Sequence, residues 1–412
     1  MSDSSRLAVG QALSLRSTDG DHRQVDEGVP SLSGLSFAHP EVAAGRRAHL
    51  CLDEETLRDA HIRLRSSGHD AFLLSTCLRV EIVWSGGAED AAELLTSIYG
   101  DASMSNIGVS RTDWDVFLHL CRIAAGLDSP TVGEPEVLSQ FRQAVSLTQD
   151  SAHGLGRVLE AAVGIGREAR RHLGEVPNGS LGSVAARVAA AHQRVAIMGA
   201  GAMAQSAARM LSGTELSIFA RRPGRVAGHE TRPWDDSVEA LASDAVVIST
   251  VPGPGPLLTD GSIAAALSRR TGRLELIDLG MPPGFESLRD HPAVGYLGID
   301  EIASSAPDKA MPAVEELVLA EASSSWNRLA ASDRVGSVIA AMLGQAEQAV
   351  DQEVQRFAGR LPGAEDPEQI LRQLAHTVAR RVLHPPISYV GSTAGGDEAV
   401  DVLAEAFGVS DE

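Results

Sequence analysis

The feature that most constrains the fold is an apolar strand that runs into a glycine turn and a helix start at residues 195–204. The segment reads Val-Ala-Ile-Met-Gly-Ala-Gly-Ala-Met-Ala. The first glycine permits a tight turn, the second lets backbone approach a pyrophosphate, and the final alanine allows close helix–strand packing. Amide groups at the helix N-terminus would face the phosphates. The alternative is a tight turn in an unliganded sheet. The residues expected to bind a dinucleotide are Gly199, Ala200, Gly201, Ala202, Met203 and Ala204.

Apolar strands continue after this turn, at residues 216–220, 245–249 and 274–279, and alternate with helical segments. This rhythm is typical of a parallel sheet with crossover helices, so a Rossmann-type α/β domain is expected. Arg221 and Arg222 follow the second strand, where NAD sites usually carry an acidic residue. Two guanidinium groups suit a 2′-phosphate and favour NADP(H). The alternative is an exposed basic turn.

The regions on either side have different patterns. Residues 31–150 mix short strands, at 71–74 and 81–84, with helices that include 113–125, which predicts an α+β domain. Near the C-terminus, apolar residues recur at helical spacing over 335–357 and again over 370–382. Two antiparallel helices with such a stripe need a partner pair, which favours a homodimer. The expected boundaries are a flexible extension at 1–30, a catalytic domain at 31–172, an NADPH-binding domain at 173–312 and an all-α dimerisation domain at 313–412.

Composition limits the setting and the partners. The 412 residues include three cysteines, carry a formal charge of −20 and contain no apolar run of membrane-spanning length. The N-terminus does not resemble a signal peptide. We therefore expect a soluble, cytoplasmic protein in a reducing compartment, without disulfides, a membrane partner or a metal site. An RNA partner would need a local basic surface. One candidate is the run of Arg157, Arg167, Arg170 and Arg171, and a solvated helix face explains it equally well.

Cys77 is the candidate nucleophile. It lies between two expected strands, beside Thr76 and Arg79. A nearby guanidinium would lower the thiol pKa, and a thiolate attacks acyl carbonyl groups readily. The alternative is a buried, inert cysteine. His119, on the helix 113–125, is a candidate general acid or base, or a group that orients the acyl intermediate, and the alternative is a core histidine.

Three motifs in this order resemble those of the glutamyl-tRNA reductase family. Residues 74–82, Leu-Ser-Thr-Cys-Leu-Arg-Val-Glu-Ile, are similar to the family's nucleophile motif. Residues 126–136, Gly-Leu-Asp-Ser-Pro-Thr-Val-Gly-Glu-Pro-Glu, with Gln140 behind them, are similar to its substrate loop. Residues 383–386, Leu-His-Pro-Pro, resemble a signature near its C-terminal end. The order and spacing match over roughly residues 33–390.

The resemblance implies a reaction. In the family a cysteine, here Cys77, attacks the aminoacyl ester of glutamyl-tRNA, and NADPH reduces the thioester to glutamate-1-semialdehyde. This is the first step of tetrapyrrole (porphyrin, haem) biosynthesis. His119 stands where the family has a histidine that supports activity, and Arg79 is expected to bind the substrate carboxylate. The resemblance also implies a dimer and an aminotransferase that collects the product. The residues it implies for the substrate pocket are Thr76, Leu78, Arg79, Ser129, Glu134, Pro135, Glu136 and Gln140.

The chain departs from the family pattern at three positions. Leu78 and Ala220 stand where the family usually has asparagine, and Pro283 stands where it has arginine. The loss of the amide at position 78 removes a group that could hydrogen-bond substrate. Two alternatives therefore stay open. One is a non-catalytic paralogue that binds aminoacyl-tRNA or a partner, and the other is an NADP-dependent dehydrogenase of a small molecule.

Overall fold

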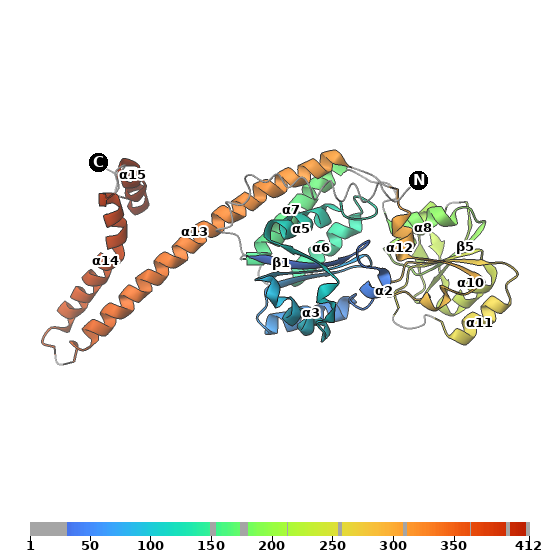
Figure 1. Cartoon of the computed structure of the whole chain (residues 1–412), viewed down its shortest axis with the longest axis horizontal. Coiled ribbons are helices and arrows are strands. Elements are labelled where there is room, and N and C mark those ends of the chain that lie inside the picture. The colour runs from blue at the N-terminus through green and yellow to red at the C-terminus, as the bar shows by residue number, and fades with distance from the viewer. Residues whose placement is uncertain are drawn as a thin grey trace. The chain divides into compact units, whose positions relative to one another are not determined.

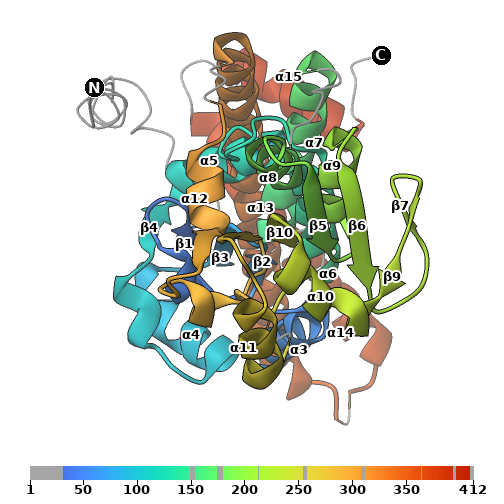
Figure 2. The same cartoon turned by 90° about the vertical axis from the view of Figure 1, so that its right-hand side faces the viewer.

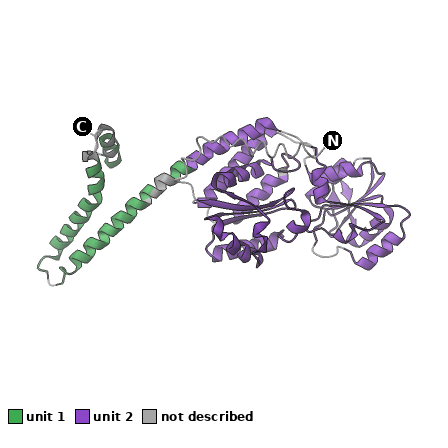
Figure 3. Ribbon diagram, viewed as in Figure 1, with its two compact units in different colours: residues 1–28, 330–412 green, residues 29–329 purple. Residues whose placement is uncertain are grey.

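The structure is a computed structural model that describes residues 31–148, 154–173, 180–211, 213–253, 258–307, 311–362, 364–392 and 396–408. The extension expected at 1–30 lies outside these residues. Contacts divide the chain into a unit of residues 29–329 and a unit of residues 1–28 and 330–412 (Figure 3). The first unit contains the predicted catalytic and cofactor domains, and the domain boundaries given above stay predictions.

The catalytic domain is an antiparallel sheet covered by helices on both faces (Figure 1). Its strands run in the order β2-β3-β1-β4: β1 (Leu32–Ala38), β2 (Ala71–Ser75), β3 (Arg79–Ser85) and β4 (Val109–Thr112). Alternate residues point to opposite faces. Leu73 and Ile82 therefore pack with α3 (Glu54–Ser66) and α4 (Ala91–Tyr99). The other face is covered by α5 (Asp113–Ala125), α6 (Pro135–Leu147) and α7 (Gly154–Leu173).

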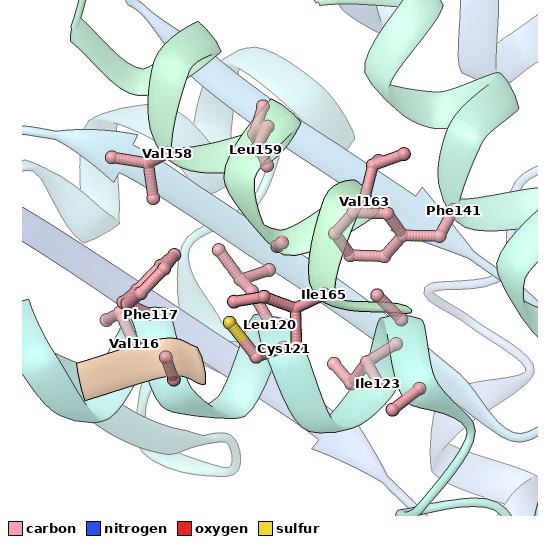
Figure 4. Close-up of a cluster of buried hydrophobic side chains, with 14 of the residues drawn as sticks. Val116, Phe117, Leu120, Cys121, Ile123, Phe141, Val158, Leu159, Val163 and Ile165 are labelled. Carbon is pink, nitrogen blue, oxygen red and sulfur yellow. The ribbon is translucent and has the colours of Figure 1, made fainter. Parts of the chain in front are cut away.

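A buried apolar cluster joins these three helices to the sheet. Figure 4 shows Phe117 and Leu120 of α5, Phe141 of α6 and Leu159 of α7 within it. The start of α13 (Pro312–Ala358) adds to the same cluster, where the Trp326 ring stacks on Phe117 at 5.4 Å between centroids. The predicted helices at 113–125 and 155–173 agree closely with α5 and α7.

The cofactor domain is a mainly parallel sheet in the order β12-β11-β10-β5-β6-β9 (Figure 2). From β5, the chain forms β6 on one side and then β10 on the other. The carboxyl ends of β5 and β10 therefore frame the crevice where such sheets bind ligands. The strands are β5 (Arg194–Met198), β6 (Glu215–Ala220), β9 (Arg232–Pro233), β10 (Val246–Ser249), β11 (Leu274–Asp278) and β12 (Val294–Gly298), with a small ribbon of β7 (Arg225–Val226) and β8 (His229–Glu230). The helices are α8 (Leu181–Ala189), α9 (Ala202–Met210), α10 (Ser237–Ser243), α11 (Asp260–Ser268) and α12 (Ile299–Ser304).

The C-terminal unit is helical, as predicted. It holds α13 beyond residue 329, α14 (Pro367–Ser392) and α15 (Gly396–Phe407), and the guanidinium of Arg381 bonds Glu353 at 2.8 Å between α14 and α13. The structure adds α15 and starts α13 at Pro312, well before the pattern recognised from Val335. No described helix has the length and apolar character needed to cross a membrane. The exposed apolar residues of α13 and α14 in this unit include Val338, Ile339, Met342, Leu343, Val350, Val354, Leu371, Val382, Leu383, Ile387 and Tyr389.

Candidate active site

Cys77 lies in a tight connection between β2 and β3. The Thr76 amide donates to the Arg79 carbonyl at 2.8 Å, and the Thr76 hydroxyl accepts from the amide of Arg79 at 3.2 Å. The His39 amide donates to the Leu78 carbonyl at 2.9 Å, which ties the connection to the end of β1. Thr76 therefore fixes the shape of the connection that presents Cys77.

A cavity of about 160 Å³ adjoins this connection. One wall comes from the catalytic domain and the other from the cofactor domain. Most of the substrate-pocket residues implied by the resemblance meet here. The lining residues are Leu74, Thr76, Cys77, Leu78, Arg79, Ser129, Glu134, Glu136, Val137 and Gln140 on one side, and Ser180, Leu181, Gly201, Ala202, Met203 and Thr250 on the other. Pro135 is the first residue of α6.

The Cys77 thiol is protonated at neutral pH. Burial raises its pKa to about 12, the charge of Glu134 adds to this effect, and the Arg47 guanidinium opposes it. The prediction that Arg79 lowers the thiol pKa is therefore wrong. The Arg79 guanidinium is directed elsewhere, to the Asp128 carbonyl and toward Glu81. A thiol in this state needs a base to take its proton when it attacks.

Glu134 lines the same cavity and is the candidate for that base. Burial and the charge of Glu136 raise its pKa to about 7, against hydrogen bonds from the hydroxyls of Ser129 (3.2 Å) and Thr131 (3.1 Å). A carboxyl with this pKa is ionised and protonated in comparable amounts near neutral pH. Thr131 was not predicted, because no sequence motif indicates a hydrogen bond between its hydroxyl and the Glu134 carboxylate.

Two buried side-chain atoms at the cavity have no hydrogen-bond partner among the described residues: Nη1 of Arg79 and Oε2 of Glu136. The nearest carboxylate oxygen to the first of them, on Glu81, is 3.6 Å away. Buried polar atoms are normally satisfied, so an unmet pair of this kind indicates a ligand with a matching acceptor and donor. The lining of the cavity thus includes one cationic side chain, Arg79, and one anionic side chain, Glu136, that each have an unmet polar atom.

His119 does not line the cavity. Its Nε2 lies 3.1 Å from Glu81 and its Nδ1 lies 3.6 Å from Asp128, whose carboxylate also accepts from Arg122 at 2.8 Å. Burial lowers the pKa of His119, but the charges of Glu81 and Asp128 outweigh it and the net pKa is raised. Because both Glu81 and the Asp128 backbone contact Arg79, this geometry suits a histidine that orients the Arg79 guanidinium.

The glycine turn is shaped as a dinucleotide site requires. Gly199 has φ of +123°, and a side chain there would lie 2.2 Å from the Thr250 hydroxyl. A side chain at Gly201 would meet nothing within 4 Å, so the space beside this backbone is open. Gly201 is the N-cap of α9 and provides no side-chain cap, which leaves amide groups for an anion. Ala204 is fully buried against the sheet core, and Ala200 is exposed in the turn.

Arg221 and Arg222 are exposed directly after β6, at the same end of the sheet. The Arg221 guanidinium lies 5.9 Å from the centroid of the Trp234 ring, a cation–π contact that orients it. In the described part of the chain, neither arginine has an ion-pair partner. Both charges are therefore available to a phosphate.

The Leu78 side chain lines the cavity and also packs into the core of the cofactor domain. Only 6% of its surface is accessible, and it packs with Leu181, Val184 and Ile299. Ala44 and Cys77 pack at the edge of the same cluster. An asparagine here would place an amide among apolar groups, so leucine suits this contact between the two domains.

The basic run on α7 serves mainly internal contacts. Arg170 donates to the Gly133 carbonyl, and Arg171 pairs with Glu168 at 2.6 Å. Arg167 instead borders an open groove of about 670 Å³ together with Arg142 of α6. Glu160 also lines this groove, so its charge is mixed.

Comparisons with known proteins follow the three domains. Residues 35–173 match the family model for the glutamyl-tRNAGlu reductase N-terminal domain, residues 183–304 the model for shikimate / quinate 5-dehydrogenase, and residues 313–409 the model for the glutamyl-tRNAGlu reductase dimerisation domain. The glutamyl-tRNA reductase of Kineococcus radiotolerans is 31% identical over 85% of this chain and 86% of its own. That of Roseiflexus castenholzii is 27% identical over 89% of this chain and 94% of its own. The solved structure of glutamyl-tRNA reductase from Methanopyrus kandleri is 24% identical, covers 91% of this chain and 97% of its own, and has a TM-score of 0.44.

Proposed function

The chain belongs to the glutamyl-tRNA reductase family, and from this premise we propose how its own residues carry out the reaction. It is an oxidoreductase with a nicotinamide cofactor that forms glutamate-1-semialdehyde from glutamyl-tRNA, the first step of tetrapyrrole biosynthesis. In our proposal Cys77 carries the acyl group as a thioester, and the cofactor is NADPH.

The observation that carries this proposal is the pair of unmet polar atoms beside the nucleophile. A glutamyl ester has a side-chain carboxylate and an α-ammonium group. The Arg79 guanidinium, whose Nη1 has no hydrogen-bond partner among the described residues, would bind the carboxylate, and Oε2 of Glu136 would accept from the ammonium group. With both contacts made, the ester carbonyl, attached to the carbon that carries the ammonium group, would lie in the cavity that Cys77 and Glu134 line.

The acyl transfer follows from these groups. Glu134 takes the thiol proton as the sulfur of Cys77 forms a bond to the ester carbonyl carbon. The bond from that carbon to the ribose oxygen breaks, and Glu134 returns the proton to this oxygen as the tRNA leaves. When bound, NADPH supplies hydride to the carbonyl carbon of the thioester. The carbon–sulfur bond would then break to free the aldehyde, Arg47 would stabilise the departing thiolate, and a proton from water would restore the thiol.

The direct test is a reaction of the protein with glutamyl-tRNA labelled in the glutamate. Without NADPH, the label should move to a peptide that contains Cys77 and should be released by hydroxylamine, as a thioester is. Addition of NADPH should convert it to semialdehyde. A protein that binds the tRNA but never takes up label is the non-catalytic paralogue. One that oxidises NADPH only with free small molecules is the alternative dehydrogenase.

The choice of cofactor is tested at the end of β6. The double variant Arg221→Ala with Arg222→Ala should lower kcat/KM for NADPH about 10- to 100-fold, because each guanidinium would lose a charged hydrogen bond to the 2′-phosphate. The value for NADH should change little. Arg225→Ala is the matched control, since Arg225 is also exposed and pairs with Glu230. Equal losses with both cofactors would contradict the assignment.

The remaining proposals concern the assembly of the protein, its cellular setting and a partner enzyme. We propose that the exposed apolar residues of α13 and α14 pair with those of a second copy, because a lone helix pair leaves them in water. We also propose a reducing, cytoplasmic setting, which keeps the Cys77 thiol free. The aldehyde product is reactive, so an aminotransferase that collects it is the partner we expect.

A further inference from the structure

The catalytic and cofactor domains meet at a second place besides the cavity, around the carboxylate of Asp300. One oxygen of Asp300 accepts from the Ala44 amide at 2.6 Å, and the other accepts from Nη2 of Arg47 at 2.6 Å. Nδ1 of His39 lies 3.2 Å from the second oxygen. We call these four residues the Asp300 cluster. Among the described residues, the hydrogen bonds between the two domains converge on it.

The cluster joins α12 of the cofactor domain to the segment between β1 and α3 of the catalytic domain. Asp300 lies on α12, whose Ile299 and Ile302 are buried in the core of the cofactor domain. His39, Ala44 and Arg47 belong to the segment between β1 and α3, and Arg47 is fully buried at the end of α2 (Ala44–Arg47). Asp300 is partly exposed, but its loss would leave the charge of the fully buried Arg47 without this partner, so the contact favours the docked arrangement of the domains.

The same segment is coupled to the nucleophile. The His39 amide bonds the Leu78 carbonyl, and the Leu78 side chain enters the cofactor-domain core. Arg47 donates to the Val42 carbonyl, and its charge opposes the raised pKa of Cys77. The Asp300 cluster and the Cys77 connection therefore occupy one continuous interface, with the cofactor turn at Gly201 across the cavity.

We infer that Asp300 and Arg47 are positioning residues for the reduction step, because they hold the cofactor domain where its glycine turn faces Cys77. The inference rests on the proposed function. The acyl transfer uses Cys77, Arg79, Glu134 and Glu136, all of the catalytic domain, whereas reduction also needs the cofactor domain in place. Loss of the cluster should therefore slow the reduction step and leave the acyl transfer nearly unchanged.

The experiment compares Asp300→Asn with Glu301→Gln in the full-length protein. Glu301 is the next residue on α12, loses the same charge, and pairs with Arg289 inside the cofactor domain at 2.7 Å. In single turnovers, Asp300→Asn should transfer label to Cys77 within about twofold of the wild-type rate and reduce it roughly 100-fold more slowly. Its affinity for NADPH, measured by fluorescence, should be unchanged. Glu301→Gln should behave as wild type in all three measurements.

The variant His39→Ala and a measurement of hydrogen exchange provide two further tests of the inference. His39→Ala removes one contact, so its reduction step should slow by a smaller factor, about 3- to 10-fold. Hydrogen exchange at residues 76–79 should be about tenfold faster in Asp300→Asn than in Glu301→Gln, with no substrate present. Equal loss of both half-reactions, or unchanged exchange, would overturn the inference. A wild-type protein that takes up no label would refute the proposed function, while the exchange data would still decide whether Asp300 docks the domains.

Discussion

Replacing Cys77 by serine should lower the rate of semialdehyde formation from glutamyl-tRNA by roughly 10³-fold or more. A serine hydroxyl is a far weaker nucleophile at neutral pH. Any acyl group it accepted would form an ester, which takes hydride less readily than a thioester. The cavity geometry should be kept, because serine is smaller and the connection is shaped by backbone bonds of Thr76 and Arg79. Single-turnover assays with labelled glutamyl-tRNA and NADPH measure the loss.

Cys51→Ser is the matched control for this substitution. Cys51 is also a half-buried free cysteine, and its Sγ lies 3.4 Å from the Thr76 carbonyl, directly beside the nucleophile connection. A serine hydroxyl keeps that donor, so activity should stay within about twofold of wild type. If Cys77→Ser retained more than a tenth of the activity, or Cys51→Ser lost as much as Cys77→Ser, the thioester mechanism would have to be abandoned.

Local patterns allowed much of the fold to be predicted. The helix at 113–125 was placed correctly because apolar residues such as Phe117 and Cys121 recur near helical spacing and Gly126, with φ of +73°, ends it. The parallel sheet followed from short apolar strands at regular intervals. The early start of α13 was missed because its first apolar residues, Val314 and Val318, pack on the catalytic domain instead of continuing the later stripe.

The candidate site was predicted where its residues are close in sequence. Residues 76–79 form one connection, and Ser129, Glu134 and Gln140 lie on one loop and the helix after it, so motif spacing brought them together. The charge that acts on the thiol was assigned to Arg79 because it is two residues away. It comes from Arg47, thirty residues upstream, which only the packing of β1 and α2 brings near.

Leu78 illustrates the same limit. From the sequence it was a missing amide in a substrate pocket, and its effect on activity could not be judged. In the structure its side chain fills an apolar contact with Leu181 and Val184, while the unmet polar atoms of the cavity belong to Arg79 and Glu136. The polar groups we propose for recognition of a glutamyl group therefore lie at other positions, and Leu78 contributes an apolar contact between the domains.

Glu134→Gln should change the pH dependence of acyl transfer as well as its rate. The ionised form of Glu134 is the base, and it forms as the pH rises through about 7. The wild-type rate should therefore rise about tenfold per pH unit below 7 and level off above it. Without the base, the rate at pH 8 should fall roughly 100-fold and should keep rising with pH, because only ionisation of the Cys77 thiol itself then supplies the nucleophile. Label transfer to Cys77, measured in single turnovers from pH 5.5 to 9, gives both profiles.

Whether Glu134→Gln slows or speeds acyl transfer shows whether Glu134 acts as a base or only repels the Cys77 thiolate. The charge of Glu134 raises the pKa of Cys77, so its removal alone lowers that pKa and would make acyl transfer faster at neutral pH. A faster Glu134→Gln variant would therefore contradict the role of base. Glu136→Gln supplies the comparison, because the charge of Glu136 raises the pKa of Glu134. In that variant the rate of acyl transfer should rise with pH as steeply as in the wild type, but over a lower pH range. Saturation should require more glutamyl-tRNA, since Glu136 would no longer pair with the substrate ammonium group.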